Sequence, residues 1–165
     1  GRDPRSELAK RLEAQTPAEP GALRILKDMR IGDEHHDLPI RIEPDALATY
    51  LERATEPLAA YREDNVLPPA QLVHMTHMTR TAVLAKAAQP AVGLFGALEV
   101  EQIAGPLRAA VDYVARTKVL KLTESPRTEN VWYEVIFTDK SGGPDVGRVL
   151  YLLRFMKGSS PLWAV

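Results

Sequence analysis

The second half of the chain constrains the fold most, because one long apolar helix is followed there by a series of long strands. Residues 70–88 carry apolar side chains on most of their circumference, which predicts a buried helix. From Leu94 the pattern changes to the two-residue alternation of strands. The expected strands are 94–103, 109–122, 130–139 and 147–157. This order favours a long antiparallel sheet wrapped around one central helix.

The last two strands form a predicted hairpin with one apolar face each. The residues expected to share the core face are Val131, Tyr133, Val135 and Phe137 in one strand and Val149, Tyr151, Leu153 and Phe155 in the other. Between the strands, residues 139–145 (DKSGGPD) are turn-forming types. The sheet therefore has a face that can pack on the helix.

The first 30 residues are interpreted as an N-terminal arm, and residues 31–165 as a single domain. In the arm, Ser6–Ala14 forms a short helix or stays mobile. Ala22–Arg30 is expected to be either a helical turn or a strand, and the pattern does not separate the two.

The start of the domain has one predicted strand and one predicted helix. His36–Ile42 is the expected strand, at a sheet edge because Pro39 has no amide hydrogen for a ladder. Pro44–Glu56 has the clearest helix pattern, with proline at the first helical position and an acid in the first turn. Leu58–Pro69 is expected to connect this helix to the buried one.

Composition excludes several classes of function. Lys and Arg number 21 against 22 Asp and Glu, so the net charge of −1 predicts no binding to nucleic acid or to an anionic membrane. The chain has no cysteine, which excludes disulfides and thiolate sites and fits the cytoplasm. No apolar run approaches the roughly 20 residues of a membrane span.

Two short segments and the last hairpin carry a resemblance to a known family. Val66–Leu72 (VLPPAQL) opens the buried helix, and Gly105–Arg108 (GPLR) precedes the next strand. With the strands at 130–139 and 147–157, this order resembles the hot-dog fold, especially the N-terminal dehydratase domain of the MaoC-like acyl dehydratases, over residues 31–158. The resemblance implies an α+β hot-dog fold and an acyl-thioester ligand held by CoA or by an acyl carrier protein. It also implies a homodimer, or a heteromer with a catalytic hot-dog chain.

The chain departs from the catalytic signature of that family. Active hydratases of the family carry D-x-N-P-x-H, whose Asp and His activate water. Here the nearest segment is Asp64-Asn65-Val66-Leu67-Pro68, with no histidine at the expected offset, and Phe95-Gly96 stands where the family has His-Gly. The resemblance therefore implies either a non-catalytic partner or a relative with altered chemistry.

A displaced acid–base pair can still be built from Asp64 with His74 or His77, because the two histidines lie one helical turn apart. The alternative is that both histidines are packing or surface residues. The residues expected to line the acyl site by resemblance are Asn65, Met75, Met78, Phe95 and the adjoining Gly96. Arg80 follows at the next turn and could bind a phosphate or a carboxylate, or extend to solvent.

No metal or other cofactor is expected, because neither His35-His36 nor the His74–His77 pair can close a zinc shell with two ligands.

The leading hypothesis is an acyl-thioester-binding protein, and if it is an enzyme, a 2-enoyl-CoA hydratase or dehydratase. The alternative is an inactive structural or binding subunit of an active hydratase. A thioesterase is less favoured, because the helix at 70–88 has no Asp or Glu to act on the ester. The acyl group, its carrier and whether turnover occurs stay open.

Overall fold

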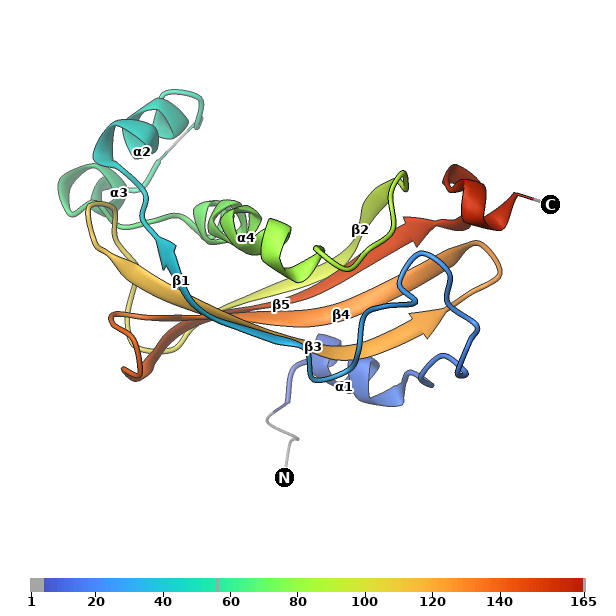
Figure 1. Ribbon diagram of the computed structural model, residues 1–165. Helices are drawn as coiled ribbons and strands as arrows, with labels where there is room; N and C mark the ends of the chain where they lie inside the picture. The colour runs from blue at the N-terminus through green and yellow to red at the C-terminus, as the bar shows by residue number, and fades with distance from the viewer. Residues whose placement is uncertain (1–4, 56, 165) are drawn as a thin grey trace.

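The computed structural model describes residues 5–55 and 57–164 as a curved antiparallel sheet with helix α4 (Pro69–Val83) on its concave face (Figure 1). The five strands are β1 (Glu34–Ile40), β2 (Gly93–Gln102), β3 (Tyr113–Glu124), β4 (Thr128–Thr138) and β5 (Asp145–Met156). Their order is β1-β3-β4-β5-β2. The predicted long sheet around a central helix is confirmed.

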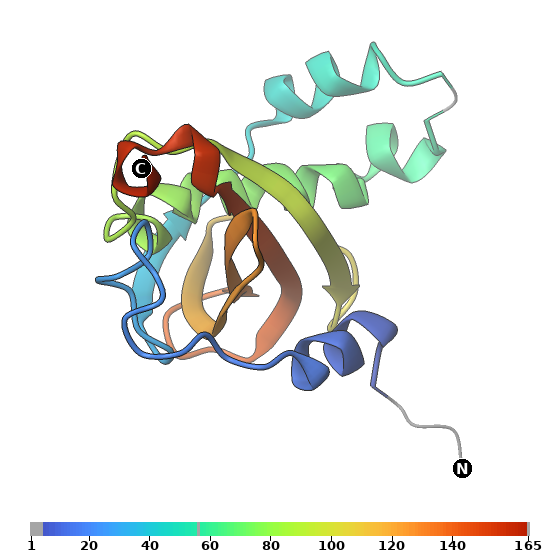
Figure 2. The same ribbon diagram turned by 90° about the vertical axis from the view of Figure 1, so that its right-hand side faces the viewer.

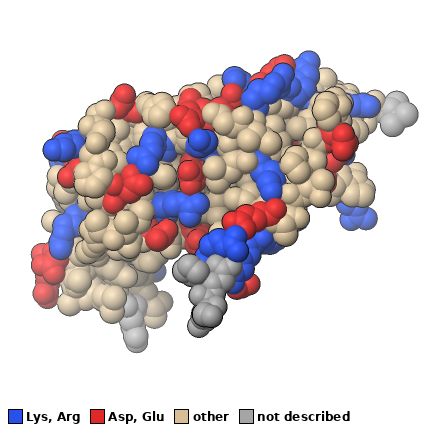
Figure 3. All heavy atoms as spheres, turned by 90° about the horizontal axis from the view of Figure 1, so that it is seen from below, with Lys and Arg blue, Asp and Glu red and all other residues tan. Residues whose placement is uncertain are grey.

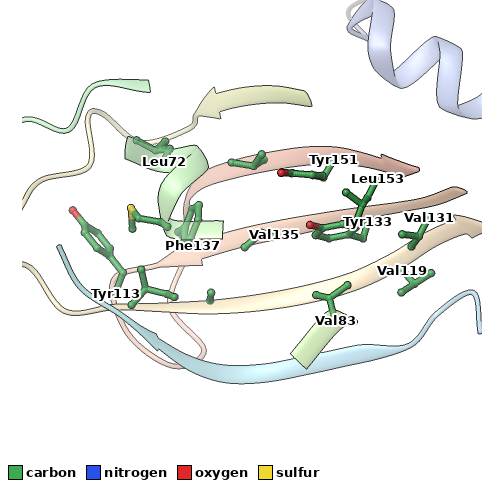
Figure 4. Packing of buried hydrophobic residues seen from close by; sticks show 14 of the residues in the cluster. Leu72, Val83, Tyr113, Val119, Val131, Tyr133, Val135, Phe137, Tyr151 and Leu153 are labelled. Atoms are coloured by element: carbon green, nitrogen blue, oxygen red, sulfur yellow. The ribbon is translucent and has the colours of Figure 1, made fainter. Parts of the chain in front are cut away.

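The core lies between α4 and the sheet, and the predicted alternation along β4 and β5 is confirmed. The inward residues of both strands are buried, and Tyr133 pairs with Tyr151 across the two strands (Figure 4). The rings of these tyrosines stack with centroids 5.1 Å apart. Apolar burial on one face of each strand therefore sets the register of the hairpin.

The two edges of the sheet differ. β1 is an edge strand, as Pro39 predicts, and it begins at Glu34 rather than at His36. β2 forms the other edge, and its pairing with β5 shifts between Phe95 and Ala97. The bulge contains Gly96, where an added Cβ would lie 2.5 Å from Cγ of Leu152. Glycine is therefore required there by close packing.

Helix α4 is not buried all round, so that part of the expectation is wrong. Its sheet side is buried, but His74, His77 and Met78 are exposed on the opposite side. The helix also ends at Val83, five residues before the expected end. Within residues 5–55 and 57–164 no element buries these three side chains, and a wide apolar stripe by itself does not supply a second layer.

Two shorter helices precede α4. α2 (Pro44–Leu51) starts at the expected proline but ends before Glu56, and α3 (Ala59–Glu63) forms inside the segment expected only to connect. An isolated β-bridge between Val66 and Arg108 then joins this region to the segment before β3. None of the helices within the described ranges is long and apolar enough to span a membrane.

The first helix, α1 (Glu7–Ala14), lies on the face of the sheet opposite α4 (Figures 1 and 2). The helical alternative for this segment is thus confirmed. Lys121 on β3 donates from Nζ to the carbonyls of Leu12, Glu13 and Gln15, which caps the carboxyl end of α1. The guanidinium of Arg11 lies 5.8 Å from the ring of the buried Trp132.

Residues 22–30 form no strand, so the strand alternative for them is wrong. They contain a single turn of the helical type, in which the amide of Met29 donates to the carbonyl of Leu26. They form an irregular loop whose amides at Arg24, Ile25 and Leu26 donate to the carboxylate of Glu129 on β4. The indole of Trp163, in the short 3-10 helix η2 (Pro161–Trp163), donates to the same carboxylate. A buried side chain about a hundred positions away thus replaces regular backbone pairing.

The convex face carries charges of both signs. Figure 3, seen from the α1 side, shows Lys and Arg interspersed with Asp and Glu over this surface. Ion pairs such as Arg148–Glu134 and Arg116–Asp145 contribute to this pattern. No extended basic stripe of the kind that binds nucleic acid is visible in this view.

Candidate functional site

An exposed apolar surface lies where α4 meets the free edge of the sheet. His77 projects from α4 beside Phe95, and Phe95 and Leu98 lie on the inward side of β2; we call these three residues the α4–β2 face. Phe95 is 55% exposed and Leu98 39%. β2 has a strand partner on one side only. An unpaired edge beside large exposed apolar side chains is typical of a surface that another molecule covers.

Aromatic rings lead from this face into the core. The centroid of His77 lies 6.3 Å from that of Phe95, and Phe95 lies 5.3 Å from Tyr151. Tyr151 stacks in turn on the fully buried Tyr133. The α4–β2 face is therefore continuous with the centre of the core.

Arg80 places a positive charge beside these rings. Its Nη2 donates to the hydroxyl of Tyr151 at 3.0 Å, and its guanidinium carbon lies 6.0 Å from the ring centroids of both Phe95 and Tyr151. Its Nε is buried without a hydrogen-bond partner, and so is the hydroxyl of Tyr133.

Burial determines the protonation of the groups around Arg80. Burial lowers the pKa of His77, and the nearby charges of Arg80 and His74 lower it further. Burial likewise raises the pKa of Tyr133 and of Tyr151, although Arg80 acts in the opposite direction. Near pH 7 the site therefore presents a neutral imidazole and two protonated phenols beside a guanidinium.

The structure does not join Asp64 to the two histidines. Asp64 is exposed at the carboxyl end of α3, where its backbone carbonyl accepts from Arg108. Over residues 5–55 and 57–164, its carboxylate forms no hydrogen bond or ion pair with His74 or His77.

The other predicted residues are divided among four places. Asn65 has a left-handed backbone (φ 55°) and lines a hollow of about 240 Å³ between α2 and α3. His74 lines a separate hollow of about 270 Å³ with Tyr50, Arg53 and Gln71. Met75 is fully buried under α4, and Gly96 forms the bulge of β2. Of the predicted set, His77, Arg80 and Phe95 come together, whereas Met78 is an exposed residue of α4.

Two functional candidates were missed by sequence reasoning. Tyr133 and Tyr151 fit the apolar alternation and were assigned to the core without a chemical role. Phenylalanine would fill the same inward positions without burying a hydroxyl. The presence of tyrosine at both positions is therefore the signal that could have identified them. Among the described residues, no group of three or more His, Asp or Glu side chains could hold a metal ion.

No protein-family model and no curated protein sequence matches this chain. Several solved structures are similar. A monoamine oxidase regulatory protein from Archaeoglobus aligns with TM-score 0.65 at 13% identity, over 84% of this chain and 96% of its own. A MaoC-like dehydratase from Rhodospirillum rubrum aligns with TM-score 0.55 at 17% identity, over 81% and 97%. The HadBC (3R-hydroxyacyl-ACP dehydratase) complex from Mycobacterium tuberculosis aligns with TM-score 0.62 at 10% identity, over 74% and 96%. With its five-stranded sheet and central helix, the chain therefore has the hot-dog fold of the MaoC-like dehydratases.

Proposed function

We propose that this protein is an acyl-thioester-binding subunit of a dehydratase-type hot-dog assembly. The observation that carries the proposal is the α4–β2 face, an exposed apolar surface beside an unpaired strand edge. The structural neighbours include MaoC-like dehydratases and a dehydratase complex, which supports an acyl ligand and a partner chain.

The α4–β2 face suits the hydrocarbon part of an acyl group. Phe95 and Leu98 are large, apolar and exposed by 55% and 39%, so covering them with a hydrocarbon chain removes unfavourable contact with water. A second chain paired along β2, either another copy or a different hot-dog chain, would enclose the ligand between the two subunits.

The chain lacks a complete acid–base pair at this face, which favours the role of partner over that of independent enzyme. Adding water to an enoyl thioester needs a group that takes a proton and a group that returns one. His77 has no carboxylate partner within the described residues, and Asp64 contacts neither histidine. In this role the catalytic pair comes from the partner chain, with CoA or an acyl carrier protein holding the ligand.

The second candidate is a hydratase in which His77 is the base without a carboxylate. The lowered pKa of His77 favours this candidate, because a neutral imidazole can accept a proton near pH 7.

The test incubates the purified protein with crotonyl-CoA and longer 2-enoyl-CoAs and follows the enoyl absorbance, with thermal shift as the binding measurement. Stabilisation by acyl-CoA without turnover supports the partner role. Turnover that His77→Ala abolishes and Asp64→Ala leaves intact establishes the second candidate instead. Turnover lost in both variants would establish the displaced Asp–His pair, and the absence of binding and turnover would reject an acyl-thioester function.

Assembly through β2 has its own control. Phe95→Asp places a charge on the α4–β2 face and should shift the protein toward monomer in analytical ultracentrifugation. Leu162→Asp is the control, because Leu162 is likewise a large exposed apolar residue, 39% against 55% for Phe95, but lies near the carboxyl terminus. Equal behaviour of the two variants would argue against this interface.

A further inference from the structure

Arg80 is a half-buried cation without a counter-ion. In the described part of the chain no Asp or Glu carboxylate pairs with its guanidinium, and α4 contains no acidic residue. Its Nε is buried and unpartnered. A desolvated charge is normally paired, because removing it from water costs free energy that only a partner offsets.

A second orphaned group lies beside Arg80. Tyr133 is 0% exposed, and its hydroxyl has no hydrogen bond of good geometry, although the side chain of Arg80 lies near enough to interact with it. Figure 4 shows the hydroxyls of Tyr133 and Tyr151 at the same end of their stacked rings. Arg80 is close enough to both phenols to oppose the rise in their pKa, and it bonds to Tyr151.

The position of Arg80 at the end of α4 accounts for only part of this arrangement. A cation in the last helical turn is favoured by the helix dipole. The helix dipole does not explain why the hydroxyl of Tyr133 and Nε of Arg80 both lack a well-formed hydrogen bond in the same place. Buried polar groups are almost always hydrogen-bonded. A further group that accepts hydrogen bonds would satisfy both atoms.

We propose that Arg80, Tyr133 and Tyr151 form a carboxylate site at the inner end of the α4–β2 face, for an acyl ligand that carries a free carboxylate. The guanidinium fork matches the two oxygens of a carboxylate, and a protonated phenol adds a donor. Phe95 and Leu98 offer apolar surface to the hydrocarbon beside it. The carboxylate site rests on the proposed acyl-binding role of this face.

Two ligand sources share this chemistry, a free fatty acid and the distal carboxylate of a dicarboxylic monothioester. The probes are therefore octanoate, octanol, octanoyl-CoA and suberyl-CoA, measured by isothermal titration calorimetry on the whole chain. We expect suberyl-CoA to bind at least about tenfold more tightly than octanoyl-CoA, and octanoate at least about tenfold more tightly than octanol, because only the first of each pair has a carboxylate at the end of its hydrocarbon chain.

Three variants identify the groups responsible. Arg80→Gln should remove that tenfold preference, measured as the ratio of the two affinities within each pair, whereas Arg127→Gln, at an exposed arginine on the far β3–β4 turn, should leave both ratios as they are in the unmodified protein. Tyr133→Phe deletes the orphaned hydroxyl, so it should keep or raise the melting temperature while weakening carboxylate binding several-fold. If Tyr133 had only a structural role, its substitution would not lower carboxylate affinity while keeping the melting temperature. Tyr133→Phe also keeps the test valid if Arg80→Gln does not fold.

The outcomes separate the carboxylate site from the proposed function. Equal binding of octanoyl-CoA and suberyl-CoA, unchanged in Arg80→Gln, would overturn the carboxylate site and leave the acyl-thioester role intact. Binding of octanoate alone, lost in Arg80→Gln, would support the carboxylate site and reject the thioester. No binding of any probe would reject both.

Discussion

Glu129 provides the most direct stability test of this fold. Its side chain is 0% exposed and accepts four hydrogen bonds, from the amides of Arg24, Ile25 and Leu26 and from the indole of Trp163. One carboxylate therefore holds the loop at 22–30 and the carboxyl-terminal segment against β4. The substitution Glu129→Gln changes this group with little change in volume.

The cost of Glu129→Gln follows from the geometry. Oε1 accepts three of the four hydrogen bonds, and Oε2 accepts the fourth, from the fully buried amide of Leu26. If the amide oxygen of glutamine takes the place of Oε1, its NH₂ group faces the amide of Leu26, so two donors meet. Losing a charge-assisted bond and leaving a buried donor unpaired cost about 2–4 kcal/mol together.

The assay is urea unfolding followed by circular dichroism, with Glu124→Gln as the control. Glu124 pairs with Lys157 at 2.7 Å near the surface, so its loss should cost at most about 1 kcal/mol. For a chain of this length, the expected loss in Glu129→Gln lowers the melting temperature by roughly 5–15 °C. A loss below about 0.5 kcal/mol, equal to that of the control, would refute the assignment of Glu129 as the anchor of this loop.

Two further predictions concern α4 and β2. Because burial lowers the pKa of His77, the unfolded chain binds more protons than the folded chain as pH falls below the ordinary value of 6.5, so acid should destabilise the protein. Urea unfolding at pH 7.5 and 5.5 should therefore show a smaller pH effect in His77→Gln, and an identical effect in both proteins would contradict this. Gly96→Ala should cost about 1–3 kcal/mol because its Cβ would overlap Leu152, whereas Gly158→Ala, with open space around it, should cost less than about 0.5 kcal/mol. Equal thermal shifts for the two glycine variants would argue against the tight bulge.

The candidate site could be predicted from the sequence only in part. Helical spacing places His77 and Arg80 one turn apart on α4, and both lie beside Phe95. Asp64 was assigned to the same site from a motif offset. Its position is instead set by the end of α3 and by the contact with Arg108, which no local pattern in the sequence contains.

The sequence by itself determined the strands of the second half, which of their residues face inward, and the edge position of β1. These features follow from local periodicity and from the missing amide hydrogen of proline, which act within a few residues of the chain. Only the tertiary structure decided that Glu129 holds the loop at 22–30, that one side of α4 stays exposed, and that Arg80 meets Tyr133 and Tyr151. These contacts join residues about 50 to 105 positions apart, and which groups meet depends on how the sheet curves around α4.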